Sequence, residues 1–176
     1  MLRIVTILGA AVLSVNAFAL DLKSADIEEG SRMDTSFEFN GFGCEGGNVS
    51  PALSWSNAPA DTKSFAVTAY DPDAPTESGF WHWVVLDIPE SENGLAKGAS
   101  GNGISGQELM NDYGMVGYGG PCPPKGHGMH RYQFTVWALP VEKLEIPKGA
   151  SNAVVGYFLN HMNLDKARLT ATFVTE

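Results

Sequence analysis

The chain has 176 residues, with 11 Lys and Arg against 20 Asp and Glu, and a formal net charge of −9 at pH 7. That length is sufficient for one domain with a sizeable core. The net negative charge and the lack of a basic patch disfavour nucleic acid and anionic membrane surfaces as partners, because both repel an acidic protein at long range.

The first 19 residues have the pattern of a secretory signal peptide. Arg3 precedes an apolar run from Ile4 to Val15, and Ala17-Phe18-Ala19 is a small-x-small cleavage signal. We therefore expect a mature domain over 20–176 that starts at Leu20 and is periplasmic or secreted. The apolar run is short for a membrane span, so we expect no stable membrane insertion. An N-terminal anchor or a buried strand is the alternative.

The first part of the mature chain predicts short strands separated by turns. Edge strands are expected at 21–22 and 36–39, followed by a glycine-rich loop over 40–51. The segments 52–55 and 64–70 are expected to form a hairpin, and 64–70 should be a central strand because it is apolar on both faces. Another strand is expected at 81–89, where Pro89 ends it.

The second part contains an irregular, glycine-rich excursion over 90–117, in which one helical turn is expected around Gln107 to Met110. A Gly/Pro turn leads into a strand at 132–139. One helix is expected from Ser151 as N-cap to Asn163, and a final strand at 169–174. This pattern predicts a mainly β, single-domain, antiparallel β-sandwich-like fold with one or two short helices.

The two cysteines, Cys44 and Cys122, both lie in Gly/Pro loops of the mature chain. In an oxidising compartment they are expected to form a disulfide. The alternatives are two free thiols or a zinc site, and the lack of Cys-x-x-Cys spacing disfavours zinc.

Polar side chains gather at two strand ends beside proline-stiffened turns. They are Asp71, Asp73 and His82 in one region, and His130, Arg131 and Tyr132 in the other. Such a set is compatible with a metal site, an acid–base pair or an anion pocket. The spacing is not a known metal-ligand run, so we expect no metal. Alternatively, the two aspartates only cap a turn.

At these residues the chain resembles a known family. Asp-Pro-Asp-Ala-Pro at 71–75, His82-Trp83, and Gly-Gly-Pro-Cys-Pro-Pro-Lys-Gly at 119–126 followed by His130-Arg131-Tyr132 are similar to the signature regions of the phosphatidylethanolamine-binding proteins, also called Raf kinase inhibitor proteins. The similarity is to the bacterial YbhB/YbcL branch, and the exported start is most like the periplasmic YbcL proteins.

The resemblance implies a domain built on a large antiparallel sheet, with a small surface cavity that binds phosphate, acetate or a phosphorylated head group, and no cofactor. The implied ligand-binding residues are Asp71, Asp73, Ala74, Pro75, His82, Pro124, His130 and Tyr132. Two departures matter. Cys122 stands where the eukaryotic branch tends to carry glycine, and the chain ends in a strand, so that branch's lipid and kinase-partner properties are not carried over.

The chemistry of such a pocket follows from its side chains. Imidazoles, the Tyr132 hydroxyl and backbone amides donate hydrogen bonds to an anion, whereas ionised Asp71 and Asp73 only accept. We expect the aspartates either to orient the imidazoles and raise their pKa or to accept from a protonated phosphate oxygen, which favours a protonated or small monoanion. His127 is expected to be exposed and outside the site. His161 is expected to be a partly buried structural residue, and Trp81 and Trp83 to be the tryptophans nearest a ligand.

The leading hypothesis is an exported protein that binds a small anion or phosphorylated ligand without turnover and modulates or inhibits a protein partner. The rival is an esterase or phosphatase that uses the Asp/His pocket, although the chain has no Gly-x-Ser-x-Gly, His-Glu-x-x-His or P-loop spacing. A third hypothesis is an interaction module with a vestigial pocket. The sequence is compatible with a monomer or a homodimer.

Overall fold

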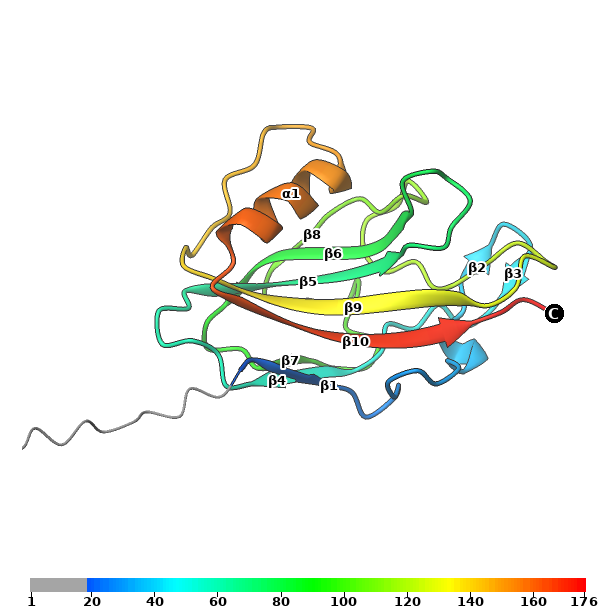
Figure 1. Cartoon of the computed structure of the whole chain (residues 1–176), viewed down its shortest axis with the longest axis horizontal. Coiled ribbons are helices and arrows are strands. Elements are labelled where there is room, and N and C mark those ends of the chain that lie inside the picture. Colours follow the sequence, from blue (N-terminus) through cyan, green and yellow to red (C-terminus); the bar gives the residue numbers. More distant parts are fainter. Residues whose placement is uncertain (1–18) are drawn as a thin grey trace, which may run out of the picture.

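The computed structural model describes residues 19–176 and shows a mainly β fold with one α-helix (Figure 1). The strands are β1 (Asp21–Lys23), β2 (Asn40–Gly41), β3 (Cys44–Glu45), β4 (Leu53–Ser56), β5 (Ser64–Asp71), β6 (Phe80–Pro89), β7 (Gly94–Leu95), β8 (Gln107–Glu108), β9 (His130–Leu139) and β10 (Asp165–Phe173). The helix α1 spans Asn152–Met162, and a 3-10 helix spans Thr35–Phe37. The predicted mainly β antiparallel fold is confirmed. The predicted signal peptide lies outside the described residues, apart from its last residue, Ala19.

Two sheets form the framework. The main sheet has five strands in the order β10-β9-β5-β6-β8, and a second sheet has three in the order β1-β4-β7. Figure 1 shows the second sheet on one side of the main sheet and α1 on the other. The central position predicted for 64–70 is confirmed, because β5 pairs with both β6 and β9. Between Ala19 and Glu176, no helix is long and apolar enough to cross a membrane.

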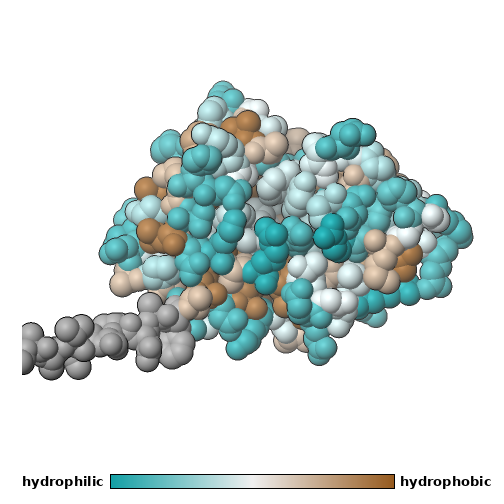
Figure 2. Space-filling view, viewed as in Figure 1, coloured by the Kyte–Doolittle hydropathy of each residue, from teal (hydrophilic) through white to brown (hydrophobic). Residues whose placement is uncertain are grey.

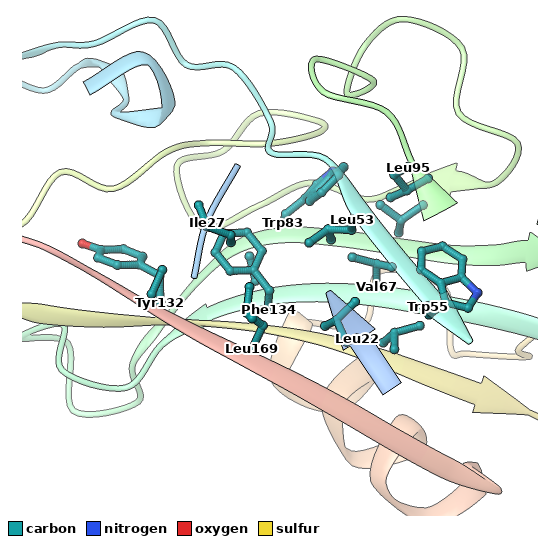
Figure 3. Close-up of a cluster of buried hydrophobic side chains, with 14 of the residues drawn as sticks. Leu22, Ile27, Leu53, Trp55, Val67, Trp83, Leu95, Tyr132, Phe134 and Leu169 are labelled. Atoms are coloured by element: carbon teal, nitrogen blue, oxygen red, sulfur yellow. The ribbon is translucent and has the colours of Figure 1, made fainter. Parts of the chain in front are cut away.

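Each face of the main sheet covers its own core. Between the two sheets, Leu22, Leu53 and Trp55 pack with Val67 and Phe134 of the main sheet (Figure 3). On the other face, Val155 and Leu159 of α1 join a separate buried cluster. Each such side chain contributes roughly 1.5–3 kcal/mol when fully buried. The face seen in Figure 2 is mostly hydrophilic, with small separate hydrophobic areas.

The predicted hairpin between 52–55 and 64–70 is wrong. β4 pairs with β1 and β7 in the second sheet, with Leu22 opposite Trp55 and Leu53 opposite Leu95. The turn after β4 is therefore a crossover between sheets. A turn-rich sequence marks a change of direction but does not say which strand the chain meets next.

Two other local predictions are wrong. The expected edge strand at 36–39 is replaced by the 3-10 helix, because the Asp34 carboxylate caps it by accepting from the Ser36 N–H at 2.8 Å. The expected helical turn at Gln107 to Met110 is instead the short strand β8, in which Glu108 pairs with Val85. The Glu108 carboxylate also accepts from the Trp83 indole at 2.8 Å, which fixes the extended conformation.

The predicted helix is confirmed. The Ser151 side chain accepts from the Val154 N–H, and the Asn163 N–H ends the helix on the Leu159 carbonyl. His161 was predicted to be partly buried but is exposed, because it lies on the outer face of α1 with Nδ1 3.0 Å from the Tyr157 carbonyl oxygen.

The predicted disulfide is confirmed. Cys44 and Cys122 are bonded, with Cα atoms 6.0 Å apart. The bond joins β3 to the Gly/Pro turn that precedes β9. It therefore anchors that turn to a distant part of the chain.

Candidate ligand-binding site

A β-bulge places His82. In the pairing of β5 with β6, Ala69 lies opposite Trp83 and Tyr70 lies opposite Trp81, so His82 is an extra residue with no partner on β5. Its own carbonyl accepts from the Gly119 N–H at 2.8 Å. A bulge re-aims a side chain, and this one turns the His82 imidazole into a cavity.

The same bulge explains a wrong prediction. Trp83 is fully buried in the core, and Trp81 packs on the other face of the sheet against Gly156 of α1. Neither tryptophan lines the cavity, whereas Phe80 does. Phe80 precedes His82 by two residues, and this spacing was the available signal for it.

The cavity has a volume of about 150 Å³ and lies where β5, β6, β9 and the Gly/Pro turn meet. Its walls are Asp71, Ala74, Pro75, Thr76, Phe80, His82, Tyr113, Cys122, Pro123, Pro124, His130 and Tyr132. Every residue implied by the resemblance is present except Asp73. The signature motifs did not identify Thr76, Phe80, Tyr113 and Pro123 as wall residues, and Cys122 was expected only in the disulfide. Tyr113 had no local signal, because it lies in the irregular excursion.

A buried carboxylate–imidazole pair forms one wall. Asp71 Oδ2 lies 2.7 Å from His130 Nδ1, and both side chains are almost completely buried. A carboxylate only accepts, so the Nδ1–H of His130 donates. The other Asp71 oxygen accepts from the Asp73 N–H at 2.7 Å. Asp71 therefore caps the turn and orients the imidazole at the same time.

Asp73 faces away from the cavity. Its carboxylate accepts from the Arg131 guanidinium at 2.7 and 2.9 Å and from the Arg131 backbone N–H at 2.9 Å. These hydrogen bonds from Arg131 hold the pKa of Asp73 below its usual value. Asp73 thus ties the loop after β5 to the start of β9 and supports the wall from behind.

The His82 ring has a fixed tautomer. Nδ1 lies 2.7 Å from the Gly119 carbonyl oxygen and 3.1 Å from that of Gly120. Carbonyl oxygens only accept, so Nδ1 carries the proton and, in the neutral ring, Nε2 carries a lone pair. Burial lowers the pKa of His82, and the charge of Asp71 raises it only in part. The expected raising effect of the aspartate is present but burial outweighs it.

Tyr132 supplies a buried hydroxyl. The residue is 1% exposed, and its Oη has no hydrogen-bond partner within residues 19–176. Figure 3 shows the hydroxyl at the end of the core, directed away from the other labelled side chains. Burial raises the pKa of Tyr132, so the hydroxyl remains a donor. A buried polar group without a partner costs about 1–3 kcal/mol, and its place in a cavity wall indicates a ligand.

The part of the chain that the structure describes contains no group of three or more His, Cys, Asp or Glu side chains placed to hold a metal ion. Among the polar side chains of the cavity wall, the Tyr132 hydroxyl and the Nε2 atom of His82 have no partner in the described part of the chain, whereas both oxygens of Asp71 and both nitrogens of His130 are engaged. Together these two atoms suit a small ligand that has both hydrogen-bond donors and acceptors.

Known proteins are similar to this chain in sequence and fold. The family model described as "Phosphatidylethanolamine-binding protein" matches residues 23–174. The chain is 46% identical to Escherichia coli YbcL over 175 residues, which cover 96% of this chain and 94% of YbcL. It is 44% identical to Escherichia coli YbhB over 159 residues, covering 88% and 99%.

The fold comparison agrees with the sequence comparison. The crystal structure of Escherichia coli YbcL, described as a new member of the mammalian PEBP family, superposes with a TM-score of 0.85 at 45% identity. The match covers 90% of this chain and 100% of YbcL. The chain therefore belongs to the phosphatidylethanolamine-binding protein family.

Proposed function

We propose that this protein binds a small anion, in particular phosphate or a phosphorylated molecule, in the cavity beside His82 and does not turn it over. The observation that carries the proposal is the buried Tyr132 hydroxyl, which has no partner among the described residues and lines the cavity. An anion oxygen would accept from it and remove the cost of leaving it unpaired.

The family name supports a phosphate-containing ligand, because the head group of phosphatidylethanolamine is a phosphate ester. The volume of about 150 Å³ suits such a head group better than a whole lipid. We also propose that the protein is exported, because the Cys44–Cys122 disulfide is stable in an oxidising compartment. Modulation of a protein partner is part of the proposal and would use the surface around the cavity.

The test is calorimetric titration of sodium phosphate into wild-type protein, Tyr132→Phe and Tyr157→Phe. Tyr157 is the matched control because it is exposed on α1 and is not part of the cavity wall. We expect Tyr132→Phe to weaken binding by about 1–3 kcal/mol and Tyr157→Phe to have no effect. Equal affinity in all three proteins would place the anion site elsewhere.

One observation favours the rival hydrolase. The Asp71–His130 pair is an acid–imidazole arrangement of the kind that activates a nucleophile. However, the aliphatic hydroxyl in the cavity wall belongs to Thr76, and it donates to the Gly79 carbonyl rather than to a histidine. Assays with p-nitrophenyl phosphate and p-nitrophenyl acetate separate the two functions. Turnover that disappears in His130→Ala would replace the binding proposal with a hydrolase.

A further inference from the structure

The His82 ring presents one hydrogen-bond acceptor to the cavity. Its Nδ1–H is committed to the carbonyl oxygens of Gly119 and Gly120, at 2.7 and 3.1 Å. Its Nε2 makes no hydrogen bond to any residue between Ala19 and Glu176, and the side chain lines the cavity. In the neutral ring this nitrogen accepts a hydrogen bond but cannot donate one.

None of the titratable groups packed around His82 donates a hydrogen bond to its Nε2 atom. Asp71 on β5 is an acceptor whose two oxygens are already engaged, and His130 on β9 donates its Nδ1–H to it. Tyr113, from the segment before the Gly/Pro turn, donates its hydroxyl to the Gly120 carbonyl at 3.0 Å. Asp112, on the same segment, engages the Trp81 N–H. Tyr132 on β9 keeps a free hydroxyl, which serves any anion equally well.

We propose that the cavity selects anions that carry their own proton: an oxyacid such as hydrogen phosphate donates its P–OH to His82 Nε2 and accepts from the Tyr132 hydroxyl. This inference rests on the proposed anion-binding function and names the ligand class. A fully deprotonated anion of the same shape, such as sulfate, places an oxygen lone pair against the Nε2 lone pair. It binds only after His82 gains a second proton, which burial of the ring opposes.

Inorganic phosphate and sulfate give a direct test, because above neutral pH both are tetrahedral dianions and only phosphate retains a proton. At about pH 8 we expect wild-type protein to bind phosphate about 10- to 100-fold more tightly than sulfate, as for one hydrogen bond to a charged group. At about pH 5, where His82 gains a proton more readily, the preference should narrow.

Methyl phosphate tests whether a phosphate ester follows the same rule. Its second pKa is about 6, so it carries a proton at about pH 5 and has lost it at about pH 8. We expect it to bind like phosphate at the lower pH and like sulfate at the higher one. This arm also distinguishes an esterified head group from free phosphate as the ligand in a given compartment.

Two variants identify the residue responsible. His82→Gln can turn an amide donor toward the cavity, so we expect the phosphate-to-sulfate preference at about pH 8 to fall toward unity. Tyr132→Phe should weaken both anions by the same factor and leave the preference unchanged. If His82→Gln does not fold, the affinities of wild-type protein for phosphate, sulfate and methyl phosphate at the two pH values still test whether the cavity selects protonated anions.

The possible outcomes separate the two proposals. Equal binding of phosphate and sulfate at about pH 8 would overturn proton selection and leave anion binding intact. A phosphate preference that persists unchanged in folded His82→Gln would also overturn it. Failure of all three anions to bind at either pH would overturn both proposals.

Discussion

His127 Nδ1 lies 2.7 Å from His130 Nε2, so an exposed imidazole is hydrogen-bonded to the buried one that faces Asp71. The three side chains form a continuous path from the cavity wall to the surface. The sequence predicted correctly that His127 is exposed, and His127 is not part of the cavity wall. It contacts His130 because residues 124–127 form a turn, with the His127 N–H donating to the Pro124 carbonyl.

This contact makes His127 a positioning residue for His130. We expect His130→Ala to weaken phosphate binding by about 1.5–3 kcal/mol, because it leaves the buried Asp71 carboxylate unpaired beside the anion, and His127→Ala to weaken it by about 0.5–1 kcal/mol through loss of ring orientation. His161→Ala is the control, because His161 is exposed on α1 and bonds its own helix. Calorimetric titration of phosphate into wild-type protein and the three variants measures these losses of affinity. A His127→Ala protein that binds as well as His161→Ala would deprive His127 of any role.

The two aspartates of the Asp-Pro-Asp motif should behave differently. Asp71→Asn removes the buried negative charge that accepts the hydrogen bond from His130. We therefore expect this variant to have a free energy of unfolding lower by about 1–3 kcal/mol and to bind phosphate more weakly. Asp73→Asn affects a half-exposed pair with Arg131, so we expect at most about 1 kcal/mol and little change in binding. Urea unfolding and calorimetry measure both effects. A larger loss of binding in Asp73→Asn would return that residue to the site.

The disulfide should stabilise the protein and shape the cavity. Cys44 and Cys122 are 78 positions apart, so the double variant to serine should lower the free energy of unfolding by about 4–5 kcal/mol on the chain-entropy account. Titration of thiols in unreduced, denatured protein should find none. Two free thiols per chain, or a double variant as stable as wild type, would contradict the expectation.

His82 should make stability depend on pH. Burial holds its folded pKa below the ordinary value of 6.5, so between the folded pKa and 6.5 the unfolded chain binds more protons. Stability from this residue is therefore complete above about pH 6.5 and is lost as the pH falls, by at most about 1.4 kcal/mol per pH unit. Urea unfolding across this range in wild type and His82→Gln should show a smaller slope in the variant. Identical slopes would mean that His82 does not contribute.

Processing at the predicted site would create an ion pair. The backbone N–H of Leu20 donates to Asp165 Oδ2 at 2.9 Å, so a chain that begins at Leu20 places its terminal ammonium group on that carboxylate. N-terminal sequencing of exported material should give Leu20 as the first residue. Asp165→Asn should then destabilise this chain by up to about 1 kcal/mol more than a chain that keeps Ala19. A different first residue, or equal effects in both chains, would rule out this ion pair.

Local patterns predicted the elements whose cause is local. The helix from Ser151 to Asn163 was predictable because its cap and its apolar spacing lie within one segment. Strand β5 was predictable because both of its faces are apolar. The partners of β4 were not, because pairing with β1 and β7 depends on contacts distant in sequence.

The site shows the same division. All the residues that the signature motifs implied line the cavity except Asp73, whose orientation depends on its hydrogen bonds to Arg131 of the neighbouring segment. The unpartnered hydroxyl of Tyr132 and the fixed tautomer of His82 were not predictable, because both depend on what packs against the ring. Tyr113 reaches the cavity from an excursion that has no periodic pattern.

The bulge at His82 means that the site depends on the length of the chain as well as on its residue types. One residue fewer between Phe80 and Trp83 would remove this bulge and let β6 pair with β5 continuously from Val67 to Asp71, so the sheet could survive. The imidazole that faces the cavity would be lost, even if every other signature residue remained. A single-residue deletion at this point of the strand is therefore expected to remove the imidazole from the cavity while the sheet is kept.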